Sequence, residues 1–479
     1  MDGASDSAPA DAVGDATSDA TVDSSSDTPT PNDAPSPMDS PAPADVPGVD
    51  AGPGPDGGGM VLPCVRNSYD PPWAGVTPAM TIAFNRNAAM TDEQNGAALA
   101  DAIGRLTAGQ MIQIGAGTYS VNRYWNVTVR GTAAAPIWIV AAPGAMPVIT
   151  RPDDRQNVMN VGSGMHVEYV AIRGLEFRGG SDLLRLYDVS NVWVDRNFLH
   201  DGNGVGVSAN AHDTSYVWIT RNEIRNPGGA GATAEGMYLG ANNSAVRMSC
   251  SVIAQNRVHD TAGTQGDGIE LKQGSFNNWI VENEVWNTNY PCILVYGTDA
   301  MGINLVERNT LRNSRDNTLQ VQGEAIVRNN LVIDGAGVTF SSTDHQGMSV
   351  NLRVVHNTFL NRGRAVNLSS WNGRAGMVFA NNVVYSATAE SIRFPSGSAG
   401  VMVAGNVVVG SVSGVTTGFT MGRGLIDFVS ATYDGMSRNA LPSPGSPIIG
   451  RGDAMFGVPE DITGMARMPP LDPGAYDVR

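Results

Sequence analysis

An asparagine recurs through the middle of this chain in one fixed sequence frame, and this repeat constrains the fold more than any other feature. An apolar residue stands three positions before each asparagine, and another stands two positions after it. Successive asparagines are 21 to 27 residues apart, except for one interval of 34 residues. The members of this column are Asn197, Asn222, Asn256, Asn283, Asn309, Asn330, Asn357, Asn382 and Asn406. A period this short, rich in strand-forming residues, predicts a solenoid in which each repeat is one turn.

A second polar column follows four residues after the first. Its members are Asp201, Asn226, Asp260, Asn287, Asn313, Asp334 and Asn361. We expect two short strands to flank a bend in each turn, with the first asparagine in the bend, because asparagine tolerates a left-handed backbone. Turns stacked at about 4.8 Å would let the asparagine side chains hydrogen-bond along their column. The predicted fold is therefore all-β, a single-stranded right-handed parallel β-helix whose ladder asparagines are structural.

The composition divides the chain into four parts. Residues 1–61 are rich in Asp, Ala, Pro and Ser with almost no large apolar residue, which predicts a disordered acidic tether. Residues 62–110 contain an irregular segment and an amphipathic α-helix, N-capped by Thr91, that would close the open end of the solenoid. We place the β-helix at residues 111–440 and a Pro- and Gly-rich wrapping tail at residues 441–479.

The charge pattern excludes some functions and suggests a location. The net charge is −16, but residues 1–60 hold twelve Asp and no Lys, Arg or Glu, so the remainder carries about −4. No basic surface for nucleic acid is expected, and no apolar run is long enough for a transmembrane helix. An acidic tether before a solenoid suggests a secreted or envelope-tethered monomer, although no signal-peptide pattern precedes it. The cysteines Cys64, Cys250 and Cys292 are too few for a disulfide framework or a zinc site.

The only lysine of the chain, Lys272, directs attention to one strand. The chain has 30 Lys and Arg residues, and the other 29 are arginines. In the segment GDGIELKQG, strand alternation would turn Ile269 and Leu271 inward and would place Glu270 and Lys272 on the outer face. An incidental surface lysine is the alternative explanation.

Neighbouring turns can be aligned on this strand, which predicts two outward columns. The first column is Tyr238, Glu270, Leu294, Gln320, Thr339 and Asn367, and the second is Gly240, Lys272, Tyr296, Gln322, Ser341 and Ser369. Tyrosine faces stack on sugar rings and amides bind sugar hydroxyls, so we expect Tyr238, Gln320 and Gln322 to contact a glycan. Glu235 and Asp267 share a slot on adjacent turns, where a Ca²⁺ ion could separate them; two solvated turn acids are the alternative.

These segments resemble the chondroitinase B and alginate lyase family of polysaccharide lyases, within the pectate-lyase-like superfamily of β-helix proteins. The family has a strand E-x-I-x-V-K, followed one turn later by L-x-L-R-x-G. Here DGIELK and ILVYG occupy these positions, and RGTAAAPIWIVAAPG and VAIRGLEF match two early turns of the family. Tyr296 stands where the family has arginine, and Gln265 stands where it has an acid.

The resemblance implies a mechanism. The family's lysine is the general base, its arginine assists, and a calcium ion neutralises the carboxylate of the uronate substrate. Carried over, Lys272 would be the base, and Asp267, Glu235 and Gln265 would hold calcium or orient the substrate. Apart from the resemblance, the phenol of Tyr296 on the next turn is suited to protonate the leaving oxygen, and Glu270 would assist.

We therefore expect an exported protein that cleaves an acidic polysaccharide by β-elimination. The first alternative is a non-catalytic surface protein that binds glycan or a partner along its flat face. The second is a glycoside hydrolase, because Glu270 with Asp267 or Glu235 could form a carboxyl pair. His200 and His259 are expected to be exposed rather than catalytic, and the turn at Asp344-His345 could line the groove or be a plain loop.

Overall fold

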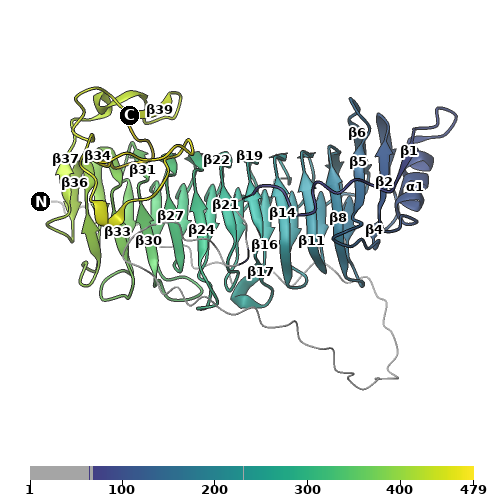
Figure 1. Cartoon of the computed structure of the whole chain (residues 1–479), viewed down its shortest axis with the longest axis horizontal. Helices are drawn as coiled ribbons and strands as arrows, with labels where there is room; N and C mark the ends of the chain where they lie inside the picture. Colours follow the sequence, from purple (N-terminus) through teal and green to yellow (C-terminus); the bar gives the residue numbers. More distant parts are fainter. Residues whose placement is uncertain (1–63, 65–67, 230, 479) are drawn as a thin grey trace, which may run out of the picture. The chain divides into compact units, whose positions relative to one another are not determined.

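The computed structural model describes residue 64, residues 68–229 and residues 231–478. These residues belong to one compact unit, Pro53–Arg479, which is a parallel β-solenoid of about 13 turns (Figure 1). The tether predicted at residues 1–61 lies outside the described residues. Among the described residues, no helix is both long enough and apolar enough to span a bilayer.

Each turn contributes strands to three walls that run the length of the solenoid (Figure 1). The first wall consists of β1 (Met80–Phe84), β2 (Gln110–Ile114), β5 (Ile137–Ala141), β8 (Val167–Arg173), β11 (Val189–Asp195), β14 (Thr214–Thr220), β18 (Val252–Ala254), β21 (Trp279–Val281), β24 (Asn304–Glu307), β27 (Ala325–Arg328), β30 (Leu352–Val355), β33 (Val378–Ala380) and β35 (Met402–Ala404), with β17 (Met248–Ser249) paired to β14.

The second wall follows the first along each turn. It consists of β3 (Gly117–Ser120), β6 (Pro147–Arg151), β9 (Glu176–Gly179), β12 (Phe198–His200), β15 (Glu223–Arg225), β19 (Arg257–Thr261), β22 (Glu284–Thr288), β25 (Thr310–Ser314), β28 (Leu331–Gly335), β31 (Thr358–Asn361), β34 (Val383–Arg393), β36 (Asn406–Ser413) and β37 (Phe419–Met421).

The third wall completes the turn and carries the candidate site. It consists of β4 (Asn126–Val127), β7 (Met159–Val161), β10 (Leu184–Leu186), β13 (Val207–Ala209), β16 (Met237–Leu239), β20 (Ile269–Leu271), β23 (Ile293–Val295), β26 (Leu319–Val321), β29 (Phe340–Ser342) and β32 (Val366–Leu368). All three walls pair in parallel, and inward apolar side chains from successive turns stack into one continuous core.

The asparagine ladder predicted from the sequence is present between the first and second walls. From Asn222 onward, each ladder Oδ1 accepts the backbone N–H and the side-chain Nδ2 of the asparagine one turn earlier, as Asn283 does from Asn256 at 3.0 Å in both cases. Each Nδ2 also donates to a strand carbonyl, as Asn283 does to Ile253 O at 2.9 Å. The ladder runs without a break from Asn197 to Asn406. These bonds lock the register of neighbouring turns.

The backbone bend at the ladder differs from our expectation. The left-handed residue is the one before each asparagine, such as Gln255 (φ 57°) and Glu282 (φ 53°), whereas the ladder asparagines themselves have negative φ. The ladder asparagine is selected for its buried amide rather than for its backbone. Left-handed conformations do occur in the second polar column, as at Asp260 (φ 57°) and Asn287 (φ 56°).

The solenoid begins and ends earlier than predicted. β1 pairs residue for residue with β2, so stacking starts at Met80 rather than at residue 111. At the far end, β37 is the last parallel strand, and β38 (Phe428–Ala431) and β39 (Arg438–Pro442) form an antiparallel hairpin. The predicted capping helix is α1 (Asp92–Ile103), which is N-capped by Thr91 in a capping box with Gln94.

A segment before β1 covers the outer face of the first wall. Outward tryptophans at Trp138 and Trp193 pack edge-on against Trp73, with ring centroids 5.6 and 6.1 Å apart. Further along the same wall, the ring of Trp279 packs against Tyr69. These contacts bury an apolar stripe that the strand alternation alone would leave in water.

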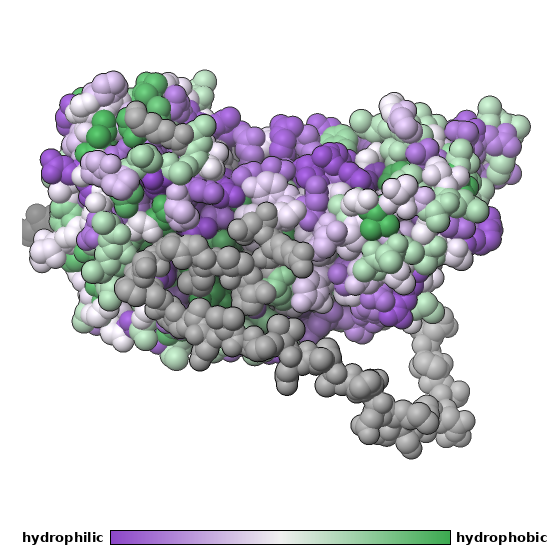
Figure 2. All heavy atoms as spheres, in the orientation of Figure 1, coloured by the Kyte–Doolittle hydropathy of each residue, from purple (hydrophilic) through white to green (hydrophobic). Residues whose placement is uncertain are grey.

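Both terminal segments meet at one arginine. The Arg308 guanidinium donates to Tyr69 Oη at 3.1 Å and to the Glu460 carboxylate at 3.1 Å. The C-terminal tail is held nearby, because Arg467 donates to Asn329 Oδ1 at 2.8 Å. Exposed large apolar side chains lie mostly toward the two ends of the solenoid, and the surface of its upper middle is hydrophilic (Figure 2).

Candidate functional site

The third wall aligns the predicted site residues in register. Backbone pairing places Tyr238 beside Glu270, Glu270 beside Leu294 and Leu294 beside Gln320. The intervening residues Ile269 and Leu271 are fully buried in the core. The first outward column is therefore confirmed from Tyr238 to Gln320.

The column departs from our alignment beyond Gln320. Gln320 pairs with Ser341, and Ser341 pairs with Asn367, so Ser341 belongs to the first column. Thr339 lies outside it, fully buried, with its hydroxyl donating to Ala365 O. The alignment was wrong by two residues because a shift of two preserves the inward and outward faces, so alternation alone cannot detect it.

Lys272 and Glu270 form a buried ion pair on the outer face of this wall. Lys272 Nζ lies 2.7 Å from Glu270 Oε1, and both side chains are almost fully buried. The ammonium also lies over two aromatic rings, 4.3 Å from the centroid of Tyr238 and 5.5 Å from that of Tyr296. Lys272 is therefore integrated into the wall rather than being an incidental surface residue.

This environment keeps Lys272 protonated. Burial alone would lower the pKa of the ammonium, but the Glu270 carboxylate and the phenols of Tyr296 and Tyr238 outweigh burial and raise the pKa above its usual value. A lysine base needs the opposite shift, which a neighbouring cation would provide. Tyr296 occupies the position where the resembling family has its arginine, and it brings no positive charge.

Two further carboxyl groups stack directly upstream of the ion pair. Glu235 and Asp267 lie two residues before β16 and β20, and Gly236 N donates to Asp267 O at 2.8 Å between the two turns. Burial, together with repulsion from Glu270, raises the pKa of Glu235 to about 7. Burial, and then repulsion from Glu270 and Glu235, holds the pKa of Asp267 well above its usual value.

Glycines make this close stacking possible. A Cβ on Gly268 would lie 2.3 Å from Val285 Cγ1 and 2.4 Å from Cys292 O. A Cβ on Gly236 would lie 2.5 Å from Gly268 O. Glu235 and Asp267 are thus each followed by a glycine, because a larger residue there would keep the next turn from approaching. This close approach places the two acids on adjacent turns, just before their third-wall strands.

The predicted calcium site gains no support from this geometry. Within residues 68–229 and 231–478 and at Cys64, no group of three or more His, Cys, Asp or Glu side chains is arranged to hold a metal ion. Asp267 Oδ1 is buried without a hydrogen-bond partner in the described part of the chain, but the positive charge beside Glu270 is already supplied by Lys272. Glu235 Oε2 accepts from Thr233 at 2.6 Å, and Gln265 is only half-buried. The calcium ligand set stays a prediction.

Four turns that follow third-wall strands meet beside Lys272. Asp299 accepts hydrogen bonds from Gln273 and from Ser244, which joins three of these turns. The fourth turn contacts the site through His345, whose ring lies 5.1 Å from that of Tyr296. The turn at Asp344-His345 therefore lines the site.

The predicted glycan contacts Gln320 and Gln322 lie on the next turn. Gln320 accepts a hydrogen bond from Asn317 at 3.1 Å. Gln322 is buried, yet neither polar atom of its amide has a hydrogen-bond partner among the described residues. Burying an amide without hydrogen-bond partners costs free energy. We therefore expect the Gln322 amide to hydrogen-bond a further polar group at this position.

Other sequence candidates lie away from this site. His200 and His259 are on the second wall and are buried rather than exposed, because each bridges carboxylates on its own turn and an adjacent turn. Cys292 is in the core, and burial raises the pKa of its thiol to about 12, which makes it a poor nucleophile. Sequence reasoning missed the disulfide between Cys64 and Cys250, since nothing in their spacing signals it.

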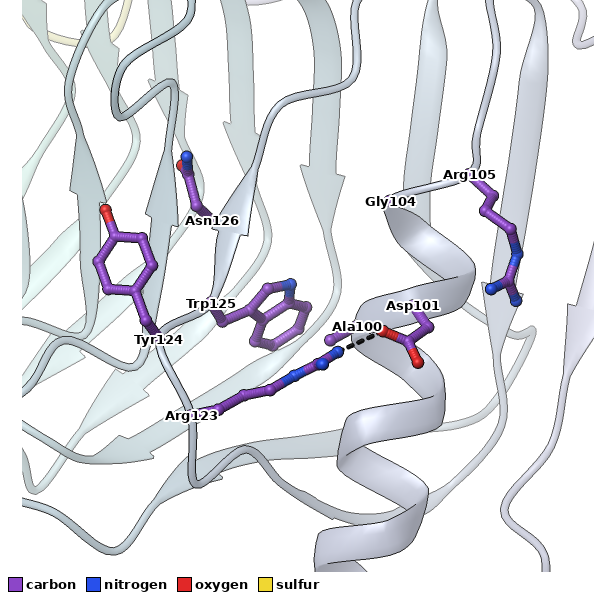
Figure 3. Close-up of a pocket in the computed structure, with 8 residues that line it drawn as sticks. All are labelled: Ala100, Asp101, Gly104, Arg105, Arg123, Tyr124, Trp125 and Asn126. Atoms are coloured by element: carbon purple, nitrogen blue, oxygen red, sulfur yellow. Dashed lines mark hydrogen bonds and ion pairs between the residues drawn. The ribbon is translucent and has the colours of Figure 1, made fainter.

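A separate polar pocket of about 360 Å³ lies between α1 and the chain leading into β4 (Figure 3). Asp101 and Arg123 form an ion pair across it, and Tyr124 stands at its edge (Figure 3). It lies four turns from the strand of Tyr238 along the third wall. It brings together no pair of carboxyl groups and none of the predicted site residues.

Comparison with known proteins supports the fold. The family described as "Right handed beta helix region" matches residues 155–311. No curated protein shows significant sequence similarity to this chain. Among solved structures, XylC in complex with xylose has a TM-score of 0.56 at 8% identity, covering 83% of this chain and 98% of XylC.

Two lyases are also among the similar structures. Pectate lyase Pel9A has a TM-score of 0.47 at 14% identity and covers 85% of this chain and 98% of its own. The alginate lyase from Paenibacillus sp. str. FPU-7 has a TM-score of 0.39 at 15% identity, covering 71% and 98%. The parallel pairing of all three walls and the family match together show that this chain is a right-handed parallel β-helix protein. Identities this low carry the fold and not the activity.

Proposed function

We propose that this chain is an exported, carbohydrate-active protein that cleaves an acidic, uronate-containing glycan by β-elimination on its third wall. The observation that supports this most is the Lys272 ammonium, held at 2.7 Å from Glu270 and over the rings of Tyr238 and Tyr296. An ammonium and tyrosine rings are suited to the carboxylate and the ring faces of a uronate.

The chemistry assigns the roles. Elimination removes the proton on C5, breaks the C4–O bond and protonates the departing oxygen, while a cation stabilises the enolate that forms. We assign the stabilising charge to Lys272, which is protonated in this environment. Glu235, with a pKa of about 7, is suited to accept the C5 proton near neutral pH, and Tyr296 to protonate the leaving oxygen. The base role thereby moves from Lys272 to Glu235.

Hydrolysis is the second candidate, and one observation favours it. Glu270 is ion-paired with Lys272, whereas burial raises the pKa of Glu235, so neighbouring carboxyl groups have different environments. A glycosidase uses such a difference to keep one carboxyl as an acid and the other ionised.

Export is supported by the disulfide between Cys64 and Cys250. Disulfides persist in oxidising compartments and are rare in the cytosol, where thiols are kept reduced. Calcium stays an expectation, which a chelator arm of the assay tests.

The test is an activity screen on pectate, alginate and glycosaminoglycans, with and without chelator. β-Elimination yields an unsaturated uronate that absorbs in the ultraviolet, whereas hydrolysis yields reducing ends without that absorbance. We expect the unsaturated product from the parent, a loss of at least about a hundredfold in Lys272→Ala and Glu235→Gln, and unchanged activity in Arg178→Ala. Arg178 is an exposed residue on β9 of the second wall. Full activity in Lys272→Ala would overturn the assignment of this site as the active site. Glycan binding without any product would favour the non-catalytic alternative.

A further inference from the structure

The outward column of the candidate site continues along the third wall toward the helix-capped end. Glu270 pairs with Tyr238, Tyr238 with Ser208, and Ser208 with Arg185. Arg185 on β10 therefore stands in the same column as Glu270, three turns away. At the usual strand spacing this separation is about 14 Å, which an oligosaccharide can bridge and a single sugar cannot.

Arg185 contacts an aromatic ring rather than a carboxylate. No carboxylate of the described residues lies within ion-pair distance of its guanidinium, whereas nearby arginines such as Arg173 and Arg221 are paired with Asp195. The guanidinium instead lies over the ring of Tyr187, 4.8 Å from its centroid. Its Nε is buried and has no hydrogen-bond partner within the part of the chain that the structure describes.

The next turn presents a matching polar group. Asn210 follows β13, in the position beside Tyr187, and its Oδ1 is also buried without a hydrogen-bond partner among the described residues. The guanidinium of Arg185, which lies on an aromatic ring, is suited to bind a carboxylate, and the neighbouring amide of Asn210 is suited to bind a hydroxyl. Unsatisfied buried polar atoms on two adjacent turns indicate that a polar ligand completes this position.

We propose that Arg185, Tyr187 and Asn210 form a second glycan subsite that binds the carboxylate of an acidic sugar residue three turns from the Lys272 cluster. This inference rests on the proposed function, since it requires an acidic chain bound along the same wall. Arg185 supplies paired N–H donors to the carboxylate, and Asn210 accepts from a sugar hydroxyl. The subsite would make recognition depend on the length of the glycan as well as on its charge.

The test is calorimetric titration with oligogalacturonates and oligomannuronates, as disaccharides and hexasaccharides, and with carboxyl-reduced hexasaccharides as neutral probes. A Glu235→Gln background prevents turnover. We expect Arg185→Gln to weaken binding of the acidic hexasaccharide about tenfold or more, as loss of a hydrogen-bonded charge pair does. The acidic disaccharide and the neutral hexasaccharide should bind as before, and Arg185→Lys should recover part of the loss.

Two controls, the Arg178→Ala variant and the neutral hexasaccharide, separate failure of the subsite from failure of its carboxylate specificity. Arg178→Ala removes an arginine from another wall and should change nothing. Unchanged binding of the acidic hexasaccharide by Arg185→Gln would overturn the subsite alone, and an equal loss for the neutral hexasaccharide would overturn its carboxylate specificity. A parent protein that binds no acidic oligosaccharide would overturn the proposed function and the subsite together.

Discussion

Removing one ladder asparagine should destabilise the solenoid strongly, and Asn283 in the middle of the ladder is the best position to test. Its side chain takes part in four hydrogen bonds, two accepted from Asn256 and two donated, to Ile253 O and to Asn309 Oδ1. At about 1 kcal/mol net for each bond, with the buried Asn256 N–H left without an acceptor, Asn283→Ala should lower the free energy of unfolding by about 3 to 5 kcal/mol.

The matched control is an exposed asparagine on the same turn. Asn287 has φ 56° and makes one side-chain hydrogen bond, to Asp260 at 3.0 Å. Asn287→Gly tolerates that backbone and should cost no more than about 0.5 kcal/mol. Guanidinium chloride unfolding, followed by circular dichroism and by tryptophan fluorescence, measures both variants. Equal midpoints for the two variants, or a loss below about 1 kcal/mol in Asn283→Ala, would refute the ladder as a source of stability.

Four further predictions rest on other contacts. Because burial raises the folded-state pKa of Glu235 from 4.5 to about 7, the folded state holds the extra proton between these values. Stability should therefore fall by roughly 3 kcal/mol from Glu235 alone as the pH rises through that window. Glu235→Gln should remove this part of the pH dependence from unfolding curves and leave the part that Asp267 contributes. Activity, in contrast, should rise with pH through about 7, since the base must be ionised, and a flat profile would argue against Glu235 as the base. Replacing Cys64 and Cys250 by Ala should lower the free energy of unfolding by about 2 to 5 kcal/mol, because the disulfide closes a long loop. Equal free energies of unfolding for the reduced and oxidised forms of the parent would contradict this. Gly268→Ala should lower the melting temperature because its Cβ would collide with the next turn, whereas Gly363→Ala, with open space around its Cβ, should leave it unchanged.

The fold could be predicted from the sequence because the repeated asparagine, which is the strongest pattern in the sequence, also fixes the register of neighbouring turns. The ladder asparagines are buried in nine successive turns, so their spacing directly reports the length of each of these turns. The outward placement of Glu270 and Lys272 followed from strand alternation in the same way. What the sequence could not give was the position of the left-handed residue, since Gln255 and Glu282 carry no signature of that conformation.

The remaining differences depend on contacts between segments far apart in the sequence. The register shift at Ser341 preserves strand faces, so only pairing with Gln320 and Asn367 reveals it. The pKa of Lys272 depends on Glu270 and on the two tyrosines that three different turns bring together, and a motif comparison could not supply its direction.

The segment over the first wall is a similar case. Outward tryptophans such as Trp138 and Trp193 could have marked a covered face, but only the position of Trp73 shows what covers them. The disulfide likewise joins positions 186 residues apart.

The most direct test of the central claim is a crystal structure of Glu235→Gln with an acidic hexasaccharide. The glycan should lie along the third wall, with one carboxylate at the Lys272 ammonium and the sugar chain extending toward Arg185. A hexasaccharide bound in the pocket beside α1, or along either of the other two walls, would contradict the claim.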